Sequence, residues 1–162
     1  MELVDAGRLQ ALVVDLFSRV PGSGLESASG QDRCILLVDN VYAPVTRTDV
    51  DRIARADPLL VPAPENAQGE LDDCDDYALH MKAALTTLFR QRRAASAADF
   101  GPPAVGIVIS EVHAVNAFVS MVNGDATLFL IDTSRPNRPV TKEPDQVAAL
   151  LLQRPAVRLI YF

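Results

Sequence analysis

A regular run of apolar residues follows Cys74 and marks the central element of the chain. Apolar side chains recur there at spacings of three and four, which places them on one face of an α-helix that packs against a core. The pattern fades at the cationic stretch 90–93, and cations are favourable near the C-terminal end of a helix. The positions that form the apolar face are Tyr77, Ala78, Met81, Ala84, Leu85, Leu88 and Phe89. We therefore predict a long helix that begins next to Cys74 and buries this face.

The rest of the hydrophobic pattern predicts three further helices and five strands. Residues 3–20 and 141–152 have helical periodicity, and a shorter helix is expected between an N-cap at Thr46 or Thr48 and Asp57. Apolar runs rich in β-branched residues predict strands at 34–38, 105–109, 112–122, 127–132 and 157–162. The first of these is a short continuous apolar run, so we expect it to be a buried strand. Helices come first and mostly antiparallel strands later, which is typical of the α+β class. With 162 residues, we expect one domain over 1–162, in which the Cys74 helix packs on an antiparallel sheet.

The dipeptide Asn123-Gly124 is the strongest hairpin signal in the chain, and it sets a testable register. In a two-residue turn, Val122 faces Asp125 and Val115 faces Asp132. His113 lies two residues from Val115 and shares its face, so His113 and Asp132 become diagonal neighbours within reach of a hydrogen bond. A three-residue turn would put them on opposite faces instead.

Composition and charge exclude several classes of partner. The net charge of −6 argues against nucleic acid or an anionic membrane as a non-specific partner. The first residues lack a basic region ahead of an apolar core, so we expect no secretory signal, and no apolar run reaches the length of a membrane span. The two cysteines, Cys34 and Cys74, are too few for a disulfide framework, which favours a reducing, cytoplasmic compartment.

Cys74 lies where a helix end can activate a thiol. If Asp73 or Asp72 is the N-cap, Cys74 is the first helical residue, and the positive end of the helix dipole favours its thiolate. The flanking aspartates, which include Asp75 and Asp76, oppose a thiolate by charge repulsion. An activated Cys74 therefore requires a positive partner.

Of the two histidines, His113 is a better candidate for that positive partner than His80. A thiol at a helix start, an imidazole on a strand and a carboxylate that orients the imidazole form the arrangement of a cysteine nucleophile with its base. Asp132 would bind one ring nitrogen of His113 and leave the other to face Cys74. His80, six residues beyond Cys74, falls roughly 120° around the helix from the thiol, so we assign it to the polar face.

The same residues carry a family resemblance. The runs Asp73-Cys74-Asp75-Asp76-Tyr77-Ala78, His113-Ala114-Val115-Asn116 and Leu130-Ile131-Asp132 resemble motifs of the transglutaminase-like and papain-like cysteine peptidases. They are most similar to those of bacterial transglutaminase-like cysteine proteinases and of the protease domain of a mushroom agglutinin. The resemblance implies a papain-like or transglutaminase-like α+β fold, with Cys74 as nucleophile, His113 as general base and acid, and Asp132 as orienter.

The resemblance also suggests an oxyanion-hole residue and a substrate class. Papain-type peptidases place a Gln six residues before the nucleophile, followed by Gly, and Gln68-Gly69 stands there in this chain. Together with the backbone N–H of Cys74, Gln68 would bind the oxyanion of a tetrahedral intermediate, an effect worth about 3 kcal/mol per donor. The expected chemistry is hydrolysis of a peptide or protein substrate through a thioester, with no cofactor and no metal.

Several alternatives remain open at this point. The same three residues would serve acyl transfer of the transglutaminase type, and a non-catalytic binding module could keep the fold. Cys74 and His113 could be buried structural residues, and Asp132 could begin an Asx-turn. The acidic run 72–76 could hold calcium, whereas zinc lacks a close pair of ligands. The pattern does not indicate an oligomeric state.

Overall fold

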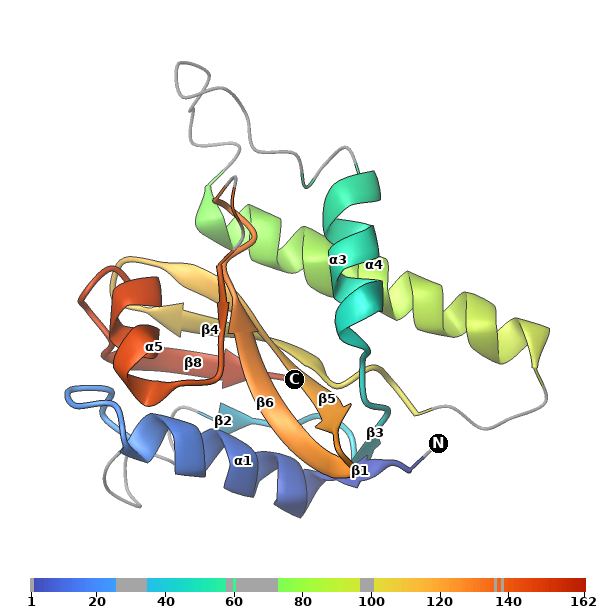
Figure 1. The fold of residues 1–162 in the computed structure, drawn as a ribbon, viewed down its shortest axis with the longest axis horizontal. Coiled ribbons are helices and arrows are strands. Elements are labelled where there is room, and N and C mark those ends of the chain that lie inside the picture. Colours follow the sequence, from blue (N-terminus) through green and yellow to red (C-terminus); the bar gives the residue numbers. More distant parts are fainter. Residues whose placement is uncertain are drawn as a thin grey trace.

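The computed structural model describes residues 2–25, 35–57, 60, 73–96, 101–135, 137 and 139–162 (Figure 1). Its helices are α1 (Ala6–Ser18), α3 (Arg47–Ala56), α4 (Cys74–Ala95) and α5 (Pro144–Leu150). Its strands are β1 (Val4–Asp5), β2 (Ile35–Leu36), β3 (Val41–Tyr42), β4 (Val105–Ser110), β5 (Ala114–Val122), β6 (Asp125–Ile131), β7 (Val140–Thr141) and β8 (Val157–Tyr161). The fold is α+β, as the sequence predicted.

The sheet that carries the site has six strands in the order β2-β8-β4-β5-β6-β7. All neighbouring strands in it are antiparallel except β2 and β8, which run parallel. The sheet is therefore mixed but mostly antiparallel, as the order of the predicted elements indicated. A separate two-stranded sheet joins β1 and β3.

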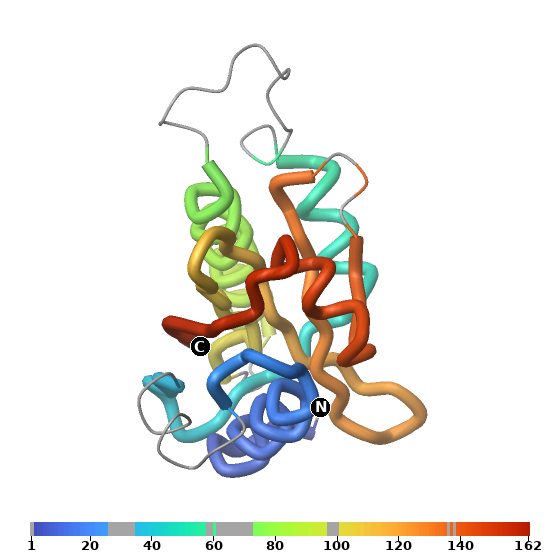
Figure 2. Tube along the Cα trace, turned by 90° about the vertical axis from the view of Figure 1, so that its left-hand side faces the viewer, coloured from blue at the N-terminus to red at the C-terminus, as the bar shows by residue number. Residues whose placement is uncertain are grey.

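Helices cover both faces of the large sheet (Figures 1 and 2). Side chains of α1 and α5 pack with Val115, Ala117 and Val119 of β5, whereas α3 and α4 pack in a second cluster that includes Phe118. Because successive strand side chains point to opposite faces, β5 contributes to both layers of core and is buried along most of its length. This central strand therefore connects the α4 layer to the α1 layer.

The register of the β5–β6 hairpin is the predicted one. Val122 faces Asp125 and the pairing continues to Asn116 opposite Ile131, so two residues form the turn. Asn123 and Gly124 have φ values of 53° and 91°, as a turn with two left-handed residues requires. Continuation of this register brings Asp132 level with Val115.

Capping explains where the two helices of the α3–α4 layer begin. The side chain of Thr46 accepts a hydrogen bond from the Asp49 N–H at the start of α3, and the side chain of Asp73 accepts one from the Asp76 N–H at the start of α4. Each cap was among the candidates predicted from the sequence. The apolar face of α4 is buried through Tyr77, Ala78, Met81, Leu85 and Phe89.

The prediction for residues 34–38 was wrong in its burial and length. The observed strand β2 is limited to Ile35–Leu36 and lies at the edge of the sheet, while the side chains of Leu36 and Val38 are 49% and 55% exposed. A short apolar run has the same appearance in an edge strand as in a central one, so the pattern could not distinguish them. Cys34 lies outside the described residues. The helix predicted at 141–152 is the shorter α5, because residues 140–141 instead form β7.

None of the helices in the described part of the chain is both long and apolar enough to cross a bilayer.

Candidate active site

Cys74 is the first residue of α4, directly after its N-cap Asp73. Its backbone N–H is one of the helix-start donors that have no acceptor within the helix. The thiol is free and half-buried. Its sulfur accepts a hydrogen bond from the backbone N–H of Ala114, the first residue of β5, with a donor–sulfur distance of 3.2 Å. The start of α4 is thus attached to the start of β5 through the sulfur itself.

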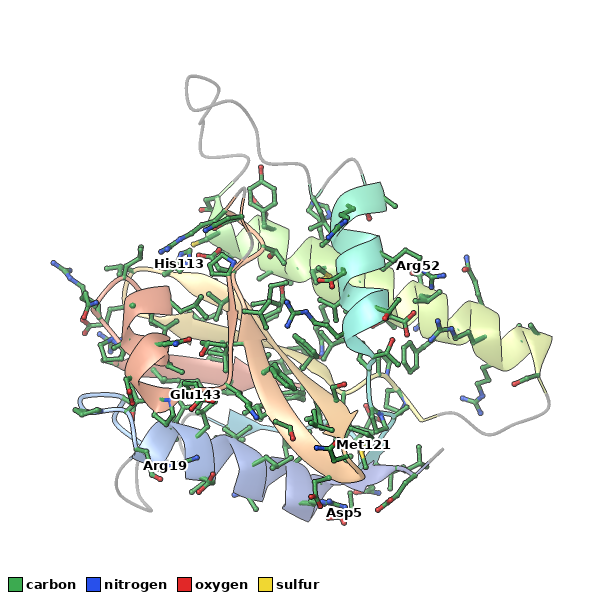
Figure 3. All side chains as sticks on the ribbon, viewed as in Figure 1. Asp5, Arg19, Arg52, His113, Met121 and Glu143 are labelled. Carbon is green, nitrogen blue, oxygen red and sulfur yellow. The ribbon has the colours of Figure 1, made fainter. Side chains whose placement is uncertain are left out.

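His113 lies directly before β5, where the connection from β4 is held tightly by Ser110. The Ser110 hydroxyl donates to the carbonyl of His113 at 3.0 Å and accepts from its N–H at 3.2 Å. The Ser110 N–H also donates to the His113 carbonyl at 2.9 Å. Figure 3 shows His113 at the end of the sheet that lies beside the start of α4. Three hydrogen bonds therefore fix the backbone from which the imidazole projects.

The imidazole of His113 is bonded to Asp132 on one side and interacts with Cys74 as well. Nε2 of His113 lies 2.8 Å from Oδ2 of Asp132, and both side chains are almost completely buried. Burial acts to lower the pKa of His113, but its hydrogen bonds to Asp132 and Cys74 and the charges of both raise it to about 9. Since Nε2 is occupied by Asp132, the other ring nitrogen is left for Cys74. The prediction that the side chains of His113 and Asp132 lie within hydrogen-bond distance is confirmed.

The Asp132 side chain is fully buried, and its carboxylate has further hydrogen-bond donors besides His113. Its Oδ1 accepts from the N–H of Ser134 at 3.1 Å and from the Ser134 hydroxyl at 2.6 Å, while Nε of Arg135 lies 2.7 Å from Oδ2. Burial acts to raise the pKa of Asp132, but bonds from His113 and Ser134 and the charge of Arg135 lower it. The carboxylate is held ionised beside His113. The Asx-turn that was weighed as a structural alternative is therefore present together with the contact to His113.

A buried asparagine connects the three elements that carry these groups. The Asn116 amide donates to the carbonyl of Ala78 on α4 at 2.8 Å and to that of Gly106 on β4 at 3.2 Å. Its oxygen accepts from the hydroxyl of Thr133, which follows Asp132, at 3.2 Å. Asn116 itself lies three residues beyond His113 and is 0% exposed. A single side chain thus ties the first turns of α4 to β5 and to the end of β6.

The acidic residues at the start of α4 interact with each other. A side-chain hydrogen bond between Asp73 and Asp75 lowers the pKa of Asp73 and raises that of Asp75. Within the part of the chain that the structure describes, no group of three or more His, Cys, Asp or Glu side chains is arranged to hold a metal ion. Asp72, the further member of the calcium hypothesis, lies outside that part.

The two remaining candidates from the sequence are not part of this cluster. His80 is exposed on α4, in agreement with its assignment to the polar face. Gln68 lies outside the described residues, so its role as an oxyanion donor stays a prediction.

Sequence reasoning missed Arg135 as a contact of Asp132 and Asn116 as a connector. Arg135 had a local signal, because a cation three residues after a turn-forming aspartate can fold back onto it. Asn116 had only a weak one, namely a polar residue inside an otherwise apolar strand.

Comparisons with known proteins place this geometry in a structural context. No family model matches the chain, and no curated protein sequence matches it. Among solved structures, the chain is similar to the one described as "PSL1a-E64 complex", with a TM-score of 0.69 and 18% sequence identity. The similarity covers 99% of this chain but 51% of that chain, so this chain spans about half the length of its neighbour. At this identity the similarity is one of fold, and it is consistent with the papain-like fold expected from the sequence.

Proposed function

We propose that this protein is a cysteine-dependent hydrolase that cleaves an amide bond of a peptide or protein substrate. The observation that carries the proposal is the continuous chain of contacts at the start of α4. The Cys74 sulfur lies against the Ala114 N–H and interacts with His113, whose Nε2 is 2.8 Å from the buried Asp132. This is the order of groups that a thiol nucleophile, its base and the orienter of that base require.

In the proposed reaction, the Cys74 thiolate attacks the amide carbonyl and forms a C–S bond. The negative charge moves to the carbonyl oxygen, where the backbone N–H of Cys74 at the helix start is available as a donor. His113 then gives its proton to the leaving nitrogen as the C–N bond breaks, which yields a thioester. Neutral His113 next takes a proton from water, which attacks the thioester, and the C–S bond breaks to release the acid and the thiolate.

Asp132 has two tasks in this scheme. It holds the imidazole by Nε2 so that Nδ1 faces the sulfur, and its negative charge stabilises the protonated ring. The Ser134 and Arg135 contacts keep this carboxylate ionised and fixed in place, because they occupy Oδ1 and share Oδ2. A protonated His113 beside the sulfur is the positive partner that the acidic surroundings of Cys74 otherwise lack.

The fold similarity supports the proposal in a limited way. The neighbouring structure is a complex with E64, an inhibitor of cysteine proteases, and this chain shares its fold over 99% of its own length. An inhibitor of that class is therefore the appropriate probe for Cys74.

The test is covalent labelling of Cys74 in a Cys34→Ser background. We expect iodoacetamide to alkylate Cys74 rapidly below pH ~7, whereas an ordinary thiol reacts there slowly because its pKa is near 8.5. His113→Ala should slow this reaction at least tenfold, and His80→Ala, which removes an exposed histidine outside the cluster, is the matched control. E64 should add once to the protein and not to a Cys74→Ser variant. Equal alkylation with and without His113, together with no E64 adduct, would refute the proposal.

A further inference from the structure

A cavity lies beside residues 82–93 of α4, away from Cys74 at the start of that helix. It has a volume of about 460 Å³ and is lined by residues of α4, the approach to β3, the segment before β4 and the end of β8. Cys74, His113 and Asp132 are not among its lining residues. The α4 residue that lines the cavity and lies nearest to Cys74 in the chain is Lys82. It follows Cys74 by eight positions, which is about 12 Å along the helix axis. A volume of this size is typical of sites for small molecules.

The wall that α4 contributes to this cavity is cationic. Lys82, Arg90 and Arg93 all line it, and among the described lining residues the acidic side chain is that of Asp39. No ion-pair partner of Arg90 occurs within the described residues, in contrast to Arg92, which is paired with Asp49 outside the cavity. Among the described lining residues, positive side chains thus outnumber negative ones, which favours an anionic ligand.

Lys82 is the cation that is placed most firmly. Its Nζ donates to the carbonyl of Val105 at 2.7 Å and lies 4.6 Å from the centre of the Tyr161 ring. An ammonium group has three donors, and within the described residues this carbonyl is its hydrogen-bond acceptor. Burial lowers the pKa of Lys82 to about 8, against the opposing effect of Asp39. A cation that has lost part of its hydration gains most from an anion that replaces the lost water.

The aromatic wall of the cavity adjoins the cationic one, since the Tyr161 ring lies beside Nζ of Lys82. Phe89 of α4, Tyr42 of β3, Tyr161 of β8 and Phe162 line it, with prolines from the segment before β4. The Tyr42 and Phe162 rings pack edge to face with their centres 6.3 Å apart, a favourable arrangement of two aromatic side chains. Cationic and aromatic side chains therefore line the same cavity.

We propose that this cavity binds a small organic carboxylate, with its charged group at Lys82 and Arg90 and a compact apolar body against Phe89 and Tyr161. The cationic wall selects the charge, and the aromatic wall selects the apolar part. The proposal does not depend on the chemistry proposed for Cys74, because the two sites share no lining residue.

The test uses cyclohexanecarboxylate and its neutral match, cyclohexanecarboxamide. The chain has three tyrosines and no tryptophan, and Tyr42 and Tyr161 line the cavity, so tyrosine fluorescence reports on it directly. Neither probe absorbs where tyrosine is excited. We expect a saturable change with the carboxylate, with a dissociation constant on the order of 1 mM for so small a ligand. Binding of the amide should be at least tenfold weaker.

Two variants and one control assign the effect to this cavity. Arg90→Gln changes an exposed side chain and Lys82→Met keeps the length of a half-buried one, so each should weaken carboxylate binding at least fivefold. Arg154→Gln removes an exposed cation outside the cavity and should leave it unchanged. Equal binding of carboxylate and amide, equal loss in Arg154→Gln, or tighter binding of inorganic phosphate than of the carboxylate would overturn the proposal.

Discussion

Nε2 of His113 lies 2.8 Å from Oδ2 of Asp132, although 19 positions separate the two residues in the chain. The contact follows from the two-residue turn at Asn123-Gly124, which fixes the pairing of β5 with β6. His113 lies just before the first residue of β5 and Asp132 just after the last residue of β6. Both residues are therefore outside the regular alternation of the strands, and their side chains can meet at the end of the sheet beside α4.

The first prediction concerns the titration of His113. Hydrogen bonds to Asp132 and Cys74 overcome the effect of burial and raise the pKa of His113 to about 9. In Asp132→Asn the main stabilising charge is lost while burial remains, so the pKa should fall below the ordinary value of 6.5. Imidazole NMR signals measured against pH test this directly. The chain has two histidines, so a His80→Gln variant identifies the His113 signal. A titration near 6.5 that is insensitive to Asp132→Asn would contradict the expected pairing.

The same pKa makes stability depend on pH in a defined direction. Because the folded-state pKa of His113 is raised, its contribution is fully present below the unfolded value of 6.5 and is lost as pH rises through about 9. The shift corresponds to at most about 3 kcal/mol. We expect the free energy of unfolding of the wild type, relative to His113→Gln, to fall across this window in urea titrations. Parallel curves for the two proteins would show that the ring gains no stabilising partner on folding.

Asn116 is predicted to position Cys74 relative to His113. Asn116→Leu removes the donors to the carbonyls of Ala78 and Gly106 and should cost about 2–4 kcal/mol, since buried carbonyls lose their partner. With the Asn116 contact between α4 and β5 lost, alkylation of Cys74 in the folded variant should also slow about tenfold. The stability loss is measured by urea unfolding, and the alkylation rate is measured well below the unfolding midpoint.

Two further variants distinguish a role of Asn116 in positioning Cys74 from a role in the stability of the fold. Thr133→Val removes the bond to the Asn116 oxygen alone and should cost about 1 kcal/mol. Ser120→Ala, at another buried polar position on β5, is the matched control and should leave the alkylation rate unchanged. If Asn116→Leu loses stability but its folded form reacts at the wild-type rate, Asn116 supports the fold and does not position the site.

The parts of the molecule that the sequence predicted well depend on local signals. The start of α4 at Cys74 follows from an aspartate cap ahead of an apolar helical face, and the β5–β6 register follows from a two-residue turn. Local signals are sufficient here because capping bonds and turn dihedrals involve residues close in the chain. Together with the packing of α4 on β4 and β5, these two elements bring Cys74, His113 and Asp132 towards the same end of the sheet.

The parts that the sequence did not predict depend on distant neighbours. The run at 34–38 was expected to be buried, but Leu36 lies on an edge strand and is 49% exposed. Asn116 bonds to Ala78 across 38 positions, and nothing in the local sequence around either residue indicates that contact. The parallel pairing of β2 with β8 is likewise decided by packing between opposite ends of the chain.

The last prediction concerns the ion pair that joins α3 to the long helix α4. Arg92 binds Asp49 with both terminal nitrogens, at 2.8 and 2.6 Å, and the Asp49 side chain is 6% exposed. The Arg92 side chain is 39% exposed, so solvent screening limits the coupling free energy to about 1–2 kcal/mol in a double-mutant cycle of Asp49→Ala and Arg92→Ala. The hydrogen bond from Arg92 is the largest cause that lowers the pKa of Asp49. This stabilisation is therefore present above the pKa of Asp49 in the unfolded chain, about 3.8, and is lost as pH falls through its lower pKa in the folded protein.

The control is the double-mutant cycle of Asp49→Ala with Arg52→Ala. Arg52 is 54% exposed and makes one contact at 3.2 Å, so its coupling to Asp49 should stay below about 0.5 kcal/mol. Equal coupling for the two arginines would mean that the bidentate geometry contributes nothing to the attachment of α3 to α4.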